Sequence, residues 1–300
     1  MRHILRTMAH YLGVTKATSP PPLEQENAAE IARLIQNGEQ IIFVSSFPRS
    51  GNTWLRYLLC DCLLQAHGVA TTTESRSQVK SVIPGFRTCS ITDRDATVTP
   101  GRLFLKTHAN YHQAMTMTHC QPGANIQHIF LYRRPEDALV SYYHFCLHHN
   151  EHKATIAAGI DAFCLSQLPV WCAMGQSYLA AQAIHPKGLF FLAYEQMLVT
   201  PKPVLTALLT WLGITLDRID VQKAIDNMAF QNLQAMETAK SNRRAHQERF
   251  FRRGQSGGGQ DELKPSTLVQ IQDQTADLLQ QFEGLLAQQA EIFVDCVGEA

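Results

Sequence analysis

Residues 41–59 of the chain read IIFVSSFPRSGNTWLRYLL. The part from Ile41 to Ser46 begins with a β-branched, apolar run, which is typical of a buried strand. A short Pro-Arg-Ser-Gly turn follows, and the apolar residues from Trp54 to Leu59 then recur at helical spacing. The stretch therefore predicts a strand, a tight polar turn and a helix in direct succession.

This succession is suited to holding a phosphate group. A helix N-terminus offers N–H groups without partners and a partial positive charge. Gly51 allows close approach of the backbone to an anion, Ser50 and Thr53 add hydroxyl donors, and Arg49 adds a fixed charge. The alternative is an ordinary strand-to-helix connection with a capping Ser. The Gly-x-x-x-x-Gly-Lys-Ser/Thr signature of nucleoside triphosphatases is absent from the stretch.

The composition limits the classes of protein that the chain could represent. Its 300 residues, 45% of them hydrophobic, suffice for one large domain or two small ones. The 26 basic and 26 acidic residues give a net charge of +0, so any anion site must be local and a nucleic-acid partner is not expected. We find neither a signal peptide nor a membrane span. Residues 1–22, which end in a Pro run, are predicted to form an N-terminal arm, and 23–300 the functional domain.

The eight cysteines are scattered and form no Cys-x-x-Cys pair. Several lie among apolar residues, where a thiol behaves as a small hydrophobe. This pattern predicts structural thiols in a reducing compartment, the cytoplasm, and argues against a zinc site.

Strands and helices alternate along the chain. We expect further strands at 102–108, 126–133 and 188–194, and helices at 23–37, 53–66, 201–212, 218–228 and 266–283, with another helix opening at Pro135. Residues 67–101 are predicted to be an irregular polar segment. The alternation predicts a single α/β domain with a central parallel sheet flanked by helices. Ligands of such sheets bind beyond the carboxyl ends of the strands.

The predicted strand ends carry mostly cationic groups. They are Arg49 and Ser50 after the first strand, Lys106 and His108 at the second, Arg133, Arg134 and then Ser141 after the third, and Tyr194 and Glu195 at the fourth, while Arg252 and Arg253 lie in a later loop. This set suits a ligand with several anionic groups together with an acceptor that loses a proton. Glu195 is given a structural role.

Five motifs resemble those of the cytosolic-type sulfotransferases, in family order from about residue 40 to 260. The segment from Phe47 to Trp54 is similar to their 5′-phosphosulfate loop, and the segment from Tyr132 to Phe145 to their 3′-phosphate segment. The remaining matches are Lys106-Thr107-His108, Tyr194-Glu195 and Phe250-Phe251-Arg252-Arg253-Gly254.

The resemblance implies a P-loop NTPase-like fold and the donor 3′-phosphoadenosine 5′-phosphosulfate, with no metal required. It implies that the loop Arg49, Ser50, Gly51, Asn52, Thr53 and Trp54 holds the 5′-phosphosulfate, that Arg133, Ser141, Arg252, Arg253 and Gly254 hold the 3′-phosphate, and that Trp54, Tyr194 and Phe230 border the adenine. Phe251 is a further cofactor-binding residue that the resemblance implies. His108 would accept the proton of the acceptor hydroxyl or amine, while Lys106 and Arg49 would neutralise charge on the sulfuryl and leaving groups.

The chain departs from the family pattern at several positions. Arg49 replaces Lys, Asn52 replaces Thr, and Met228-Ala229 stands where Thr-Ser is frequent. Gly257-Gly258-Gly259 replaces Gly-Asp-Trp, from which we expect a mobile loop. The dimer motif of the family is not evident, so the oligomeric state stays open.

Two other functions are compatible with a phosphate loop. A kinase would need a Mg²⁺ site at a strand end, and a non-catalytic nucleotide-binding protein would need no base such as His108. His144, His148 and His152 recur every four residues, which would place three imidazoles on one helix face and could form a metal site, although a position in or near the acceptor pocket is preferred. The acceptor itself is left open between small molecules, lipids and glycans, with Phe86, Tyr111, Phe145, Phe163 and Trp171 as candidates for an apolar pocket.

Overall fold

The computed structural model describes residues 22–117, 125–147, 152–241, 254 and 256–297. Its centre is a four-stranded sheet of order β2-β1-β3-β4 in which all neighbours are parallel. The strands are β1 (Gln40–Ser46), β2 (Arg102–Thr107), β3 (Ile126–Tyr132) and β4 (Leu189–Ala193). The predicted parallel sheet is therefore confirmed, with each strand within two residues of its expected ends.

Side chains alternate strictly between the two faces of the sheet. In β1, Ile41 and Phe43 belong to one buried cluster, whereas Ile42 and Val44 belong to the other. The same alternation continues through β2, β3 and β4. Both faces are apolar because helices cover both of them, which is the usual environment of a parallel sheet.

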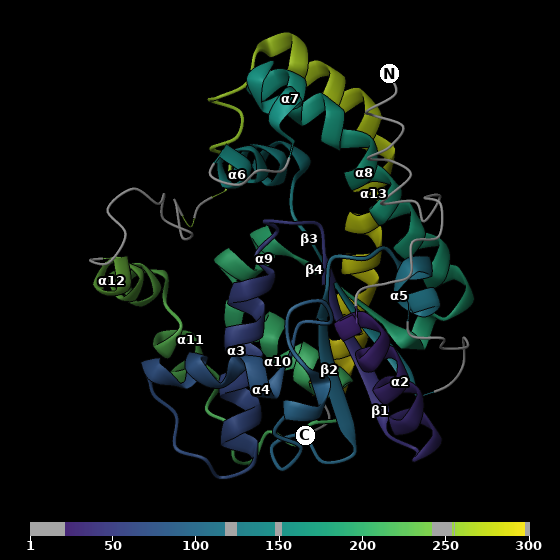
Figure 1. The fold of residues 1–300 in the computed structure, drawn as a ribbon, viewed down its shortest axis with the longest axis vertical. Coiled ribbons are helices and arrows are strands. Elements are labelled where there is room, and N and C mark those ends of the chain that lie inside the picture. Colours follow the sequence, from purple (N-terminus) through teal and green to yellow (C-terminus); the bar gives the residue numbers. More distant parts are fainter. Residues whose placement is uncertain (1–21, 118–124, 148–151, 242–253, 255, 298–300) are drawn as a thin grey trace.

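The helices form one layer on each face (Figure 1). The first face is covered by α2 (Pro22–Gln36), α5 (Tyr111–Met117), α6 (Pro135–Leu147), α8 (Ile160–Ile184) and α13 (Pro265–Val297). The second face is covered by α3 (Asn52–Ala66), α4 (Val79–Val82), α9 (Tyr194–Val199), α10 (Pro201–Trp211), α11 (Val221–Asn227) and α12 (Phe230–Ser241). The short helix α7 (Lys153–Ala157) follows α6.

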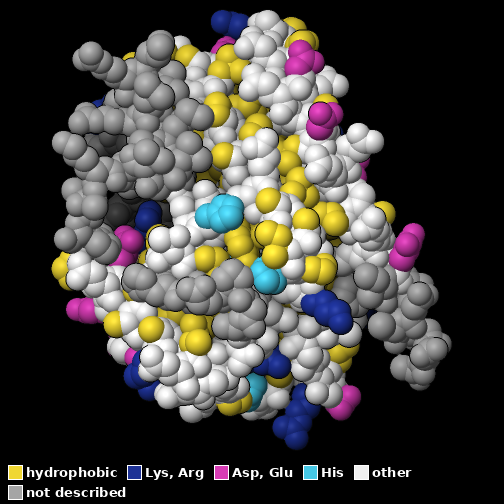
Figure 2. Space-filling view, turned by 90° about the vertical axis from the view of Figure 1, so that its right-hand side faces the viewer, with side chains coloured by type: hydrophobic (Ala, Val, Ile, Leu, Met, Phe, Trp, Pro, Cys, Tyr) yellow, Lys and Arg dark blue, Asp and Glu magenta, His cyan; other side chains and the backbone are white. Residues whose placement is uncertain are grey.

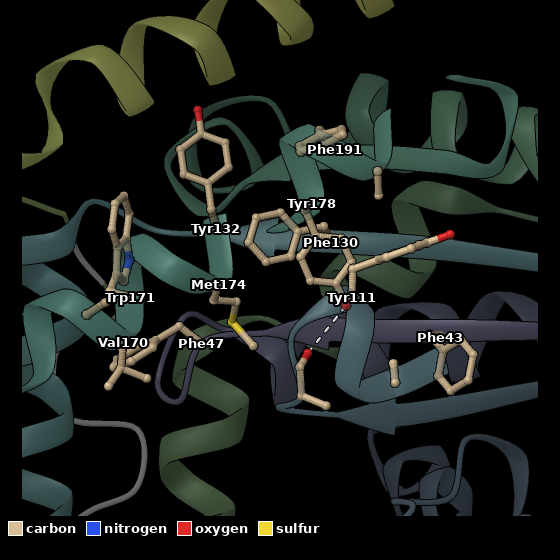
Figure 3. Close-up of a cluster of buried hydrophobic side chains, with 14 of the residues drawn as sticks. Phe43, Phe47, Tyr111, Phe130, Tyr132, Val170, Trp171, Met174, Tyr178 and Phe191 are labelled. Carbon is tan, nitrogen blue, oxygen red and sulfur yellow. Dashed lines mark hydrogen bonds between the residues drawn. The ribbon is translucent and has the colours of Figure 1, made fainter. Parts of the chain in front are cut away.

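Helix α8 was not predicted. It carries apolar side chains around most of its circumference, because α13 and α6 cover the sides that the sheet does not. Tyr178 lies flat against Phe130 of β3, with ring centroids 4.1 Å apart (Figure 3). At Gly175 an added Cβ would lie 2.9 Å from Phe282, so glycine permits the close approach of α13.

The outer edge of β4 is covered by a side chain. Gln289 of α13 accepts a hydrogen bond from the backbone N–H of Phe191 at 3.0 Å and donates one to the carbonyl of the same residue at 3.0 Å. The amide thereby occupies both ladder groups of Phe191, as a neighbouring strand would.

Residues 67–101 contain more order than was predicted. They include the 3₁₀ helices η1 (Thr73–Gln78) and η2 (Ile91–Asp93) as well as α4. Outside this segment, a further 3₁₀ helix, η3 (Pro186–Gly188), precedes β4. Asn27 of α2 donates to the carbonyls of Phe86 and Cys89 and accepts from the N–H of Ile91. This buried amide fixes the segment that leads to β2.

Phe86, Tyr111, Phe163 and Trp171, offered as residues of an apolar pocket, are all buried members of the first core cluster. The face drawn in Figure 2 mixes hydrophobic side chains with scattered charged ones rather than one basic patch. Among the described residues, no helix has the length and apolar character that crossing a bilayer requires. The N-terminal arm predicted for 1–22 lies, apart from Pro22, outside the described residues.

Candidate functional site

The turn after β1 is built on two residues with positive φ. Arg49 has φ 68° and Gly51 has φ 97°. The left-handed region is unfavourable for an arginine, and such strain is concentrated at functional sites. Gly51 is the N-cap of α3, and an added Cβ there would lie 2.5 Å from the Tyr194 ring. A side chain is thus excluded where the backbone must pass beneath Tyr194.

The loop places an unsatisfied hydroxyl at the helix N-terminus. Asn52 donates to the carbonyl of Val44 at 3.1 Å, which fixes the loop against β1. Thr53 lies in the first turn of α3. The Ser50 hydroxyl is buried and has no hydrogen-bond partner among the described residues. An oxygen of a bound phosphate would satisfy it, so the loop fits the anion site that the sequence predicts.

His108 follows β2 and is oriented by the end of β1. Its Nδ1 lies 2.7 Å from the carbonyl oxygen of Ser46. Because a carbonyl only accepts, Nδ1 carries the proton and Nε2 keeps its lone pair. Burial, followed by the charge of Lys106, lowers the pKa of His108 to about 3. The imidazole is therefore neutral at physiological pH, with a fixed tautomer.

Lys106 at the end of β2 lies in a similarly buried environment. Burial and, after it, the charges of Arg56 and Arg87 lower its pKa to about 8. The charges of Lys106, Arg56 and Arg49 each contribute to lowering the pKa of His108. The structure thus gathers the three predicted catalytic residues at the adjacent ends of β1 and β2, together with Arg56, which the sequence analysis did not select.

A second group lies over the β3 and β4 ends. Arg133 donates to the carbonyl of Arg49 at 3.2 Å, and its guanidinium stands over the Tyr194 ring, 4.5 Å from the centroid. Trp54 meets Tyr194 edge to face at 6.1 Å and donates to the carbonyl of Met228 at 3.0 Å. Trp54 and Tyr194, two of the three aromatic residues predicted to border adenine, therefore meet beside the loop between β1 and α3.

Ser141 of α6 joins this group through Arg49. The Nε of Arg49 donates to the Ser141 hydroxyl at 3.3 Å, and its guanidinium stands 5.4 Å from the ring centroid of Phe145. Phe230 begins α12, and an added Cβ on Gly254 would lie 2.4 Å from its ring. The structure therefore brings Phe230 and Gly254 into contact. Phe251, Arg252 and Arg253 lie outside the described residues.

Asp137 anchors the glycine-rich segment 256–259 to helix α6. Its Oδ2 accepts from the Ser256 hydroxyl at 3.1 Å and from the N–H of Gly257 at 2.7 Å, and its Oδ1 accepts from the N–H of Gly259 at 2.7 Å. Arg133 lies 3.9 Å from the same carboxylate. The expected mobility of the segment is therefore opposed by a buried anchor, which was not among the predicted site residues.

The predicted histidine face does not form. Helix α6 ends at Leu147, and His152 precedes α7 with φ 59°. The Nε2 of His144 lies 2.5 Å from the Oε2 of Glu262, and the Nε2 of His152 lies 3.2 Å from the Tyr142 hydroxyl. His148 falls outside the described residues, and within the described ones no three His, Cys, Asp or Glu side chains could hold a metal. Glu195 accepts from the N–H of Arg134 at 3.0 Å, in keeping with its predicted structural role.

Comparison with known proteins decides the family. The model of the sulfotransferase domain matches residues 39–283, which include every strand of the sheet and the loop between β1 and α3. The chain belongs to the sulfotransferase domain family. Cytosolic sulfotransferase 7 of Arabidopsis thaliana is 26% identical over 265 residues, which cover 81% of this sulfotransferase and 79% of the relative. Flavonol 3-sulfotransferase of Flaveria bidentis is 24% identical over 239 residues, with coverage of 72% and 74%.

Solved structures share the fold of this sulfotransferase. Mouse sulfotransferase SULT7A1 complexed with PAP gives a TM-score of 0.57 at 17% identity, covering 91% of this chain and 95% of that one. Retinol dehydratase in a complex with retinol and PAP gives 0.54 at 17% identity, covering 84% and 85%. The resemblance deduced from the sequence motifs is thus confirmed for the family and for the P-loop-like α/β fold.

Proposed function

We propose that this sulfotransferase transfers a sulfuryl group from 3′-phosphoadenosine 5′-phosphosulfate to an acceptor hydroxyl or amine, with His108 as the general base. The observation that carries the proposal is the convergence of Arg49, Lys106 and His108 at neighbouring strand ends. PAP in the related structures, taken as the desulfated donor, supports the choice of donor.

We take the donor contacts from the resemblance to the family, and the geometry of the described residues supports part of them. Backbone N–H groups at the start of α3 and the Ser50 hydroxyl would bind the 5′-phosphosulfate. Arg133 and Ser141 would bind the 3′-phosphate together with Arg252, Arg253 and Gly254, and Phe251 would contact the donor beside them. The rings of Trp54 and Tyr194, which meet on the β3 and β4 side of the loop, would border the adenine together with Phe230, which contacts Gly254.

The transfer step uses few protein groups. The acceptor oxygen or nitrogen bonds to sulfur while the bond from sulfur to the 5′-phosphate oxygen breaks, and the acceptor proton passes to Nε2 of His108. Lys106 and Arg49 stabilise the charge on the sulfuryl oxygens and on the leaving phosphate. By analogy with phosphoryl transfer, positioning and charge stabilisation account for most of the rate.

Donor binding would also adjust the base. The charges of Lys106, Arg56 and Arg49 help to hold the pKa of free His108 near 3. An anionic donor offsets those charges, so we expect the pKa of His108 to rise towards its ordinary value in the complex. The base would then be strengthened only when the donor is present.

The remaining assignments rest on the relatives. Retinol and androsterone occupy related structures, so we propose a small-molecule acceptor for this chain, whereas lipid and glycan acceptors are outcomes of the screen. The cytosolic names of the curated relatives support a cytoplasmic location.

The test combines a sulfur-labelled donor with an acceptor screen of phenols, aliphatic alcohols, amines, lipids and glycans, in the presence of a chelator. We expect turnover to persist in the chelator, and His108→Ala to keep donor affinity by calorimetry while losing turnover by about 10²–10⁴-fold. His67→Ala is the matched control, because the exposed His67 also contacts a backbone carbonyl, that of Leu63 at 3.0 Å, but stands outside the site.

Three results would contradict the proposal. Equal rates for wild type and His108→Ala would remove His108 as the base. Donor binding without turnover of any acceptor would favour a non-catalytic nucleotide-binding protein. Phosphoryl transfer that requires Mg²⁺ and a nucleoside triphosphate would favour a kinase.

A further inference from the structure

Arg56 is a half-buried cation whose charge acts on His108 but to which the roles above assign no contact with donor or acceptor. It lies one turn beyond Asn52 on α3, and its guanidinium donates to the backbone carbonyl of Ile83. Its Nε is buried and has no hydrogen-bond partner among the described residues. The residue as a whole keeps some exposure to solvent.

Arg56 and Lys106 flank the same short loop. The N–H of Lys106 donates to the carbonyl of Pro84 at 2.8 Å, and its carbonyl accepts from the N–H of Phe86 at 3.0 Å. An added Cβ on Gly85 would lie 3.8 Å from Cδ of Lys106. The guanidinium of Arg56 binds the residue immediately before this loop, so both cations lie beside it.

The two cations have no anion of their own. Neither Arg56 nor Lys106 makes an ion pair with a described residue. Burial lowers the pKa of Arg56, and the groups that act in the opposite direction are the thiol of Cys89, the phenol of Tyr57 and the thiol of Cys60, none of which is a carboxylate. Arg87, by contrast, lies 3.2 Å from Glu24. Buried like charges without a counter-ion are unfavourable, so an external anion would be attracted here.

The position of the pair separates it from the nucleotide. In the sheet order β2-β1-β3-β4, Lys106 ends the edge strand β2. Arg133 and Tyr194 follow β3 and β4, on the opposite side of β1. An anion bound by Arg56 would therefore lie on the side of Lys106 and His108, where the acceptor must enter, and away from the adenosine.

We propose that Arg56, together with Lys106, binds a negatively charged group of the acceptor: a carboxylate, phosphate or sulfate ester carried near the hydroxyl that is sulfated. This inference rests on the proposed function, because it names the acceptor class of the same site. It assigns Arg56 to substrate selection, and Lys106 would be shared between acceptor and sulfuryl group.

The test compares acidic acceptors with their neutral counterparts. The probes are para-hydroxybenzoate and para-hydroxyphenylacetate, each with its amide, and para-hydroxyphenyl phosphate with its neutral dimethyl ester. We expect kcat/KM to favour the charged member by about 10- to 100-fold through KM, the range of one hydrogen bond to a charged group. Calorimetry of the same pairs with adenosine 3′,5′-bisphosphate present should give the same preference without relying on turnover.

Variants separate recognition from support of the loop. In Arg56→Gln, the kcat/KM values of the charged and neutral members of each pair should differ by no more than about twofold. Arg56→Lys should retain part of the preference for the charged member. Arg87→Gln is the control: Arg87 is already paired with Glu24, so its replacement should leave the preference unchanged. If Arg56 only supported the loop at Ile83, its replacement would instead lower kcat/KM equally for charged and neutral acceptors. If Arg56→Gln fails to fold, the comparison of Arg56→Lys with wild type still decides.

The outcomes distinguish this inference from the function beneath it. Equal binding and equal kcat/KM for the charged and neutral members in wild type would overturn the proposal of an anionic acceptor. Turnover of any acceptor would still support sulfuryl transfer as the function. Absence of both donor binding and turnover would overturn the function and the inference together. A preference confined to the phosphate pair would narrow the ligand to phosphate esters.

Discussion

Replacing Asp137 by Asn tests how the segment 256–259 is held against α6. The carboxylate accepts three hydrogen bonds, two at Oδ2 and one at Oδ1, at 2.7 to 3.1 Å. An amide offers only one acceptor oxygen. In the better of its two orientations it keeps the contacts to Ser256 and Gly257, but its NH₂ group then faces the N–H of Gly259.

The loss can be worked out from these contacts. A hydrogen bond to a charged group contributes about 1.5–3 kcal/mol, and the two retained bonds also lose their charge assistance, so we expect docking to weaken by about 2–4 kcal/mol. Since about 1.4 kcal/mol is a factor of ten, the protection of the Gly257 and Gly259 amides against hydrogen exchange should fall by about 30- to 700-fold. Donor affinity should fall as well, because Arg133 and the segment share this carboxylate.

Hydrogen exchange followed by NMR measures the local opening directly, and calorimetry measures donor binding. Asp261→Asn is the matched control, because Asp261 is an exposed aspartate two residues beyond the segment. The reasoning would be refuted if Asp137→Asn folded normally and left the exchange of both glycine amides unchanged.

Three further predictions follow from the buried groups. The pKa of Lys106, about 8, predicts that kcat/KM for the donor falls above about pH 8 as the ammonium loses its proton, and that Lys106→Arg removes this fall; a flat wild-type profile would contradict it. Burial lowers the pKa of His128 to about 3, so between pH 6.5 and 3 the unfolded chain binds more protons and the free energy of unfolding falls as pH falls, by up to about 1.4 kcal/mol per pH unit. His128→Phe should reduce that slope in urea titrations, and an unaltered slope would refute the assignment. Gly51→Ala should lower both the melting temperature and donor affinity, because it adds a clash with Tyr194 to the strain of positive φ; Gly38→Ala, with φ 82° and open space, carries the strain alone and should cost only about 1–2 kcal/mol.

Much of the fold could be predicted because the deciding signals are local. The apolar run of β1 and the turn to α3 stand next to each other in the chain, and Pro135 with two acidic neighbours fixes the start of α6. The site residues at the strand ends then follow from the parallel sheet, since parallel strands bring their carboxyl ends to one edge.

What could not be predicted depends on long-range contacts. Helix α8 has no single apolar stripe because neighbours cover most of its circumference, so it lacks the pattern by which helices are recognised. Asp137 and Arg56 look like ordinary helix residues until the partners at Gly259 and Ile83, far away in sequence, are brought beside them. The regular spacing of His144 and His152 was misleading because the helix ends between them.

The contact of Gln289 with Phe191 bears on self-association. An exposed edge strand is a template on which a second chain can add its own strand and begin aggregation. With both outward backbone groups of Phe191 occupied by one amide, that side of the sheet is barred to an incoming strand at its middle residue. The distal turns of α13 thereby protect the folded chain against intermolecular β-pairing at this edge, a role separate from catalysis.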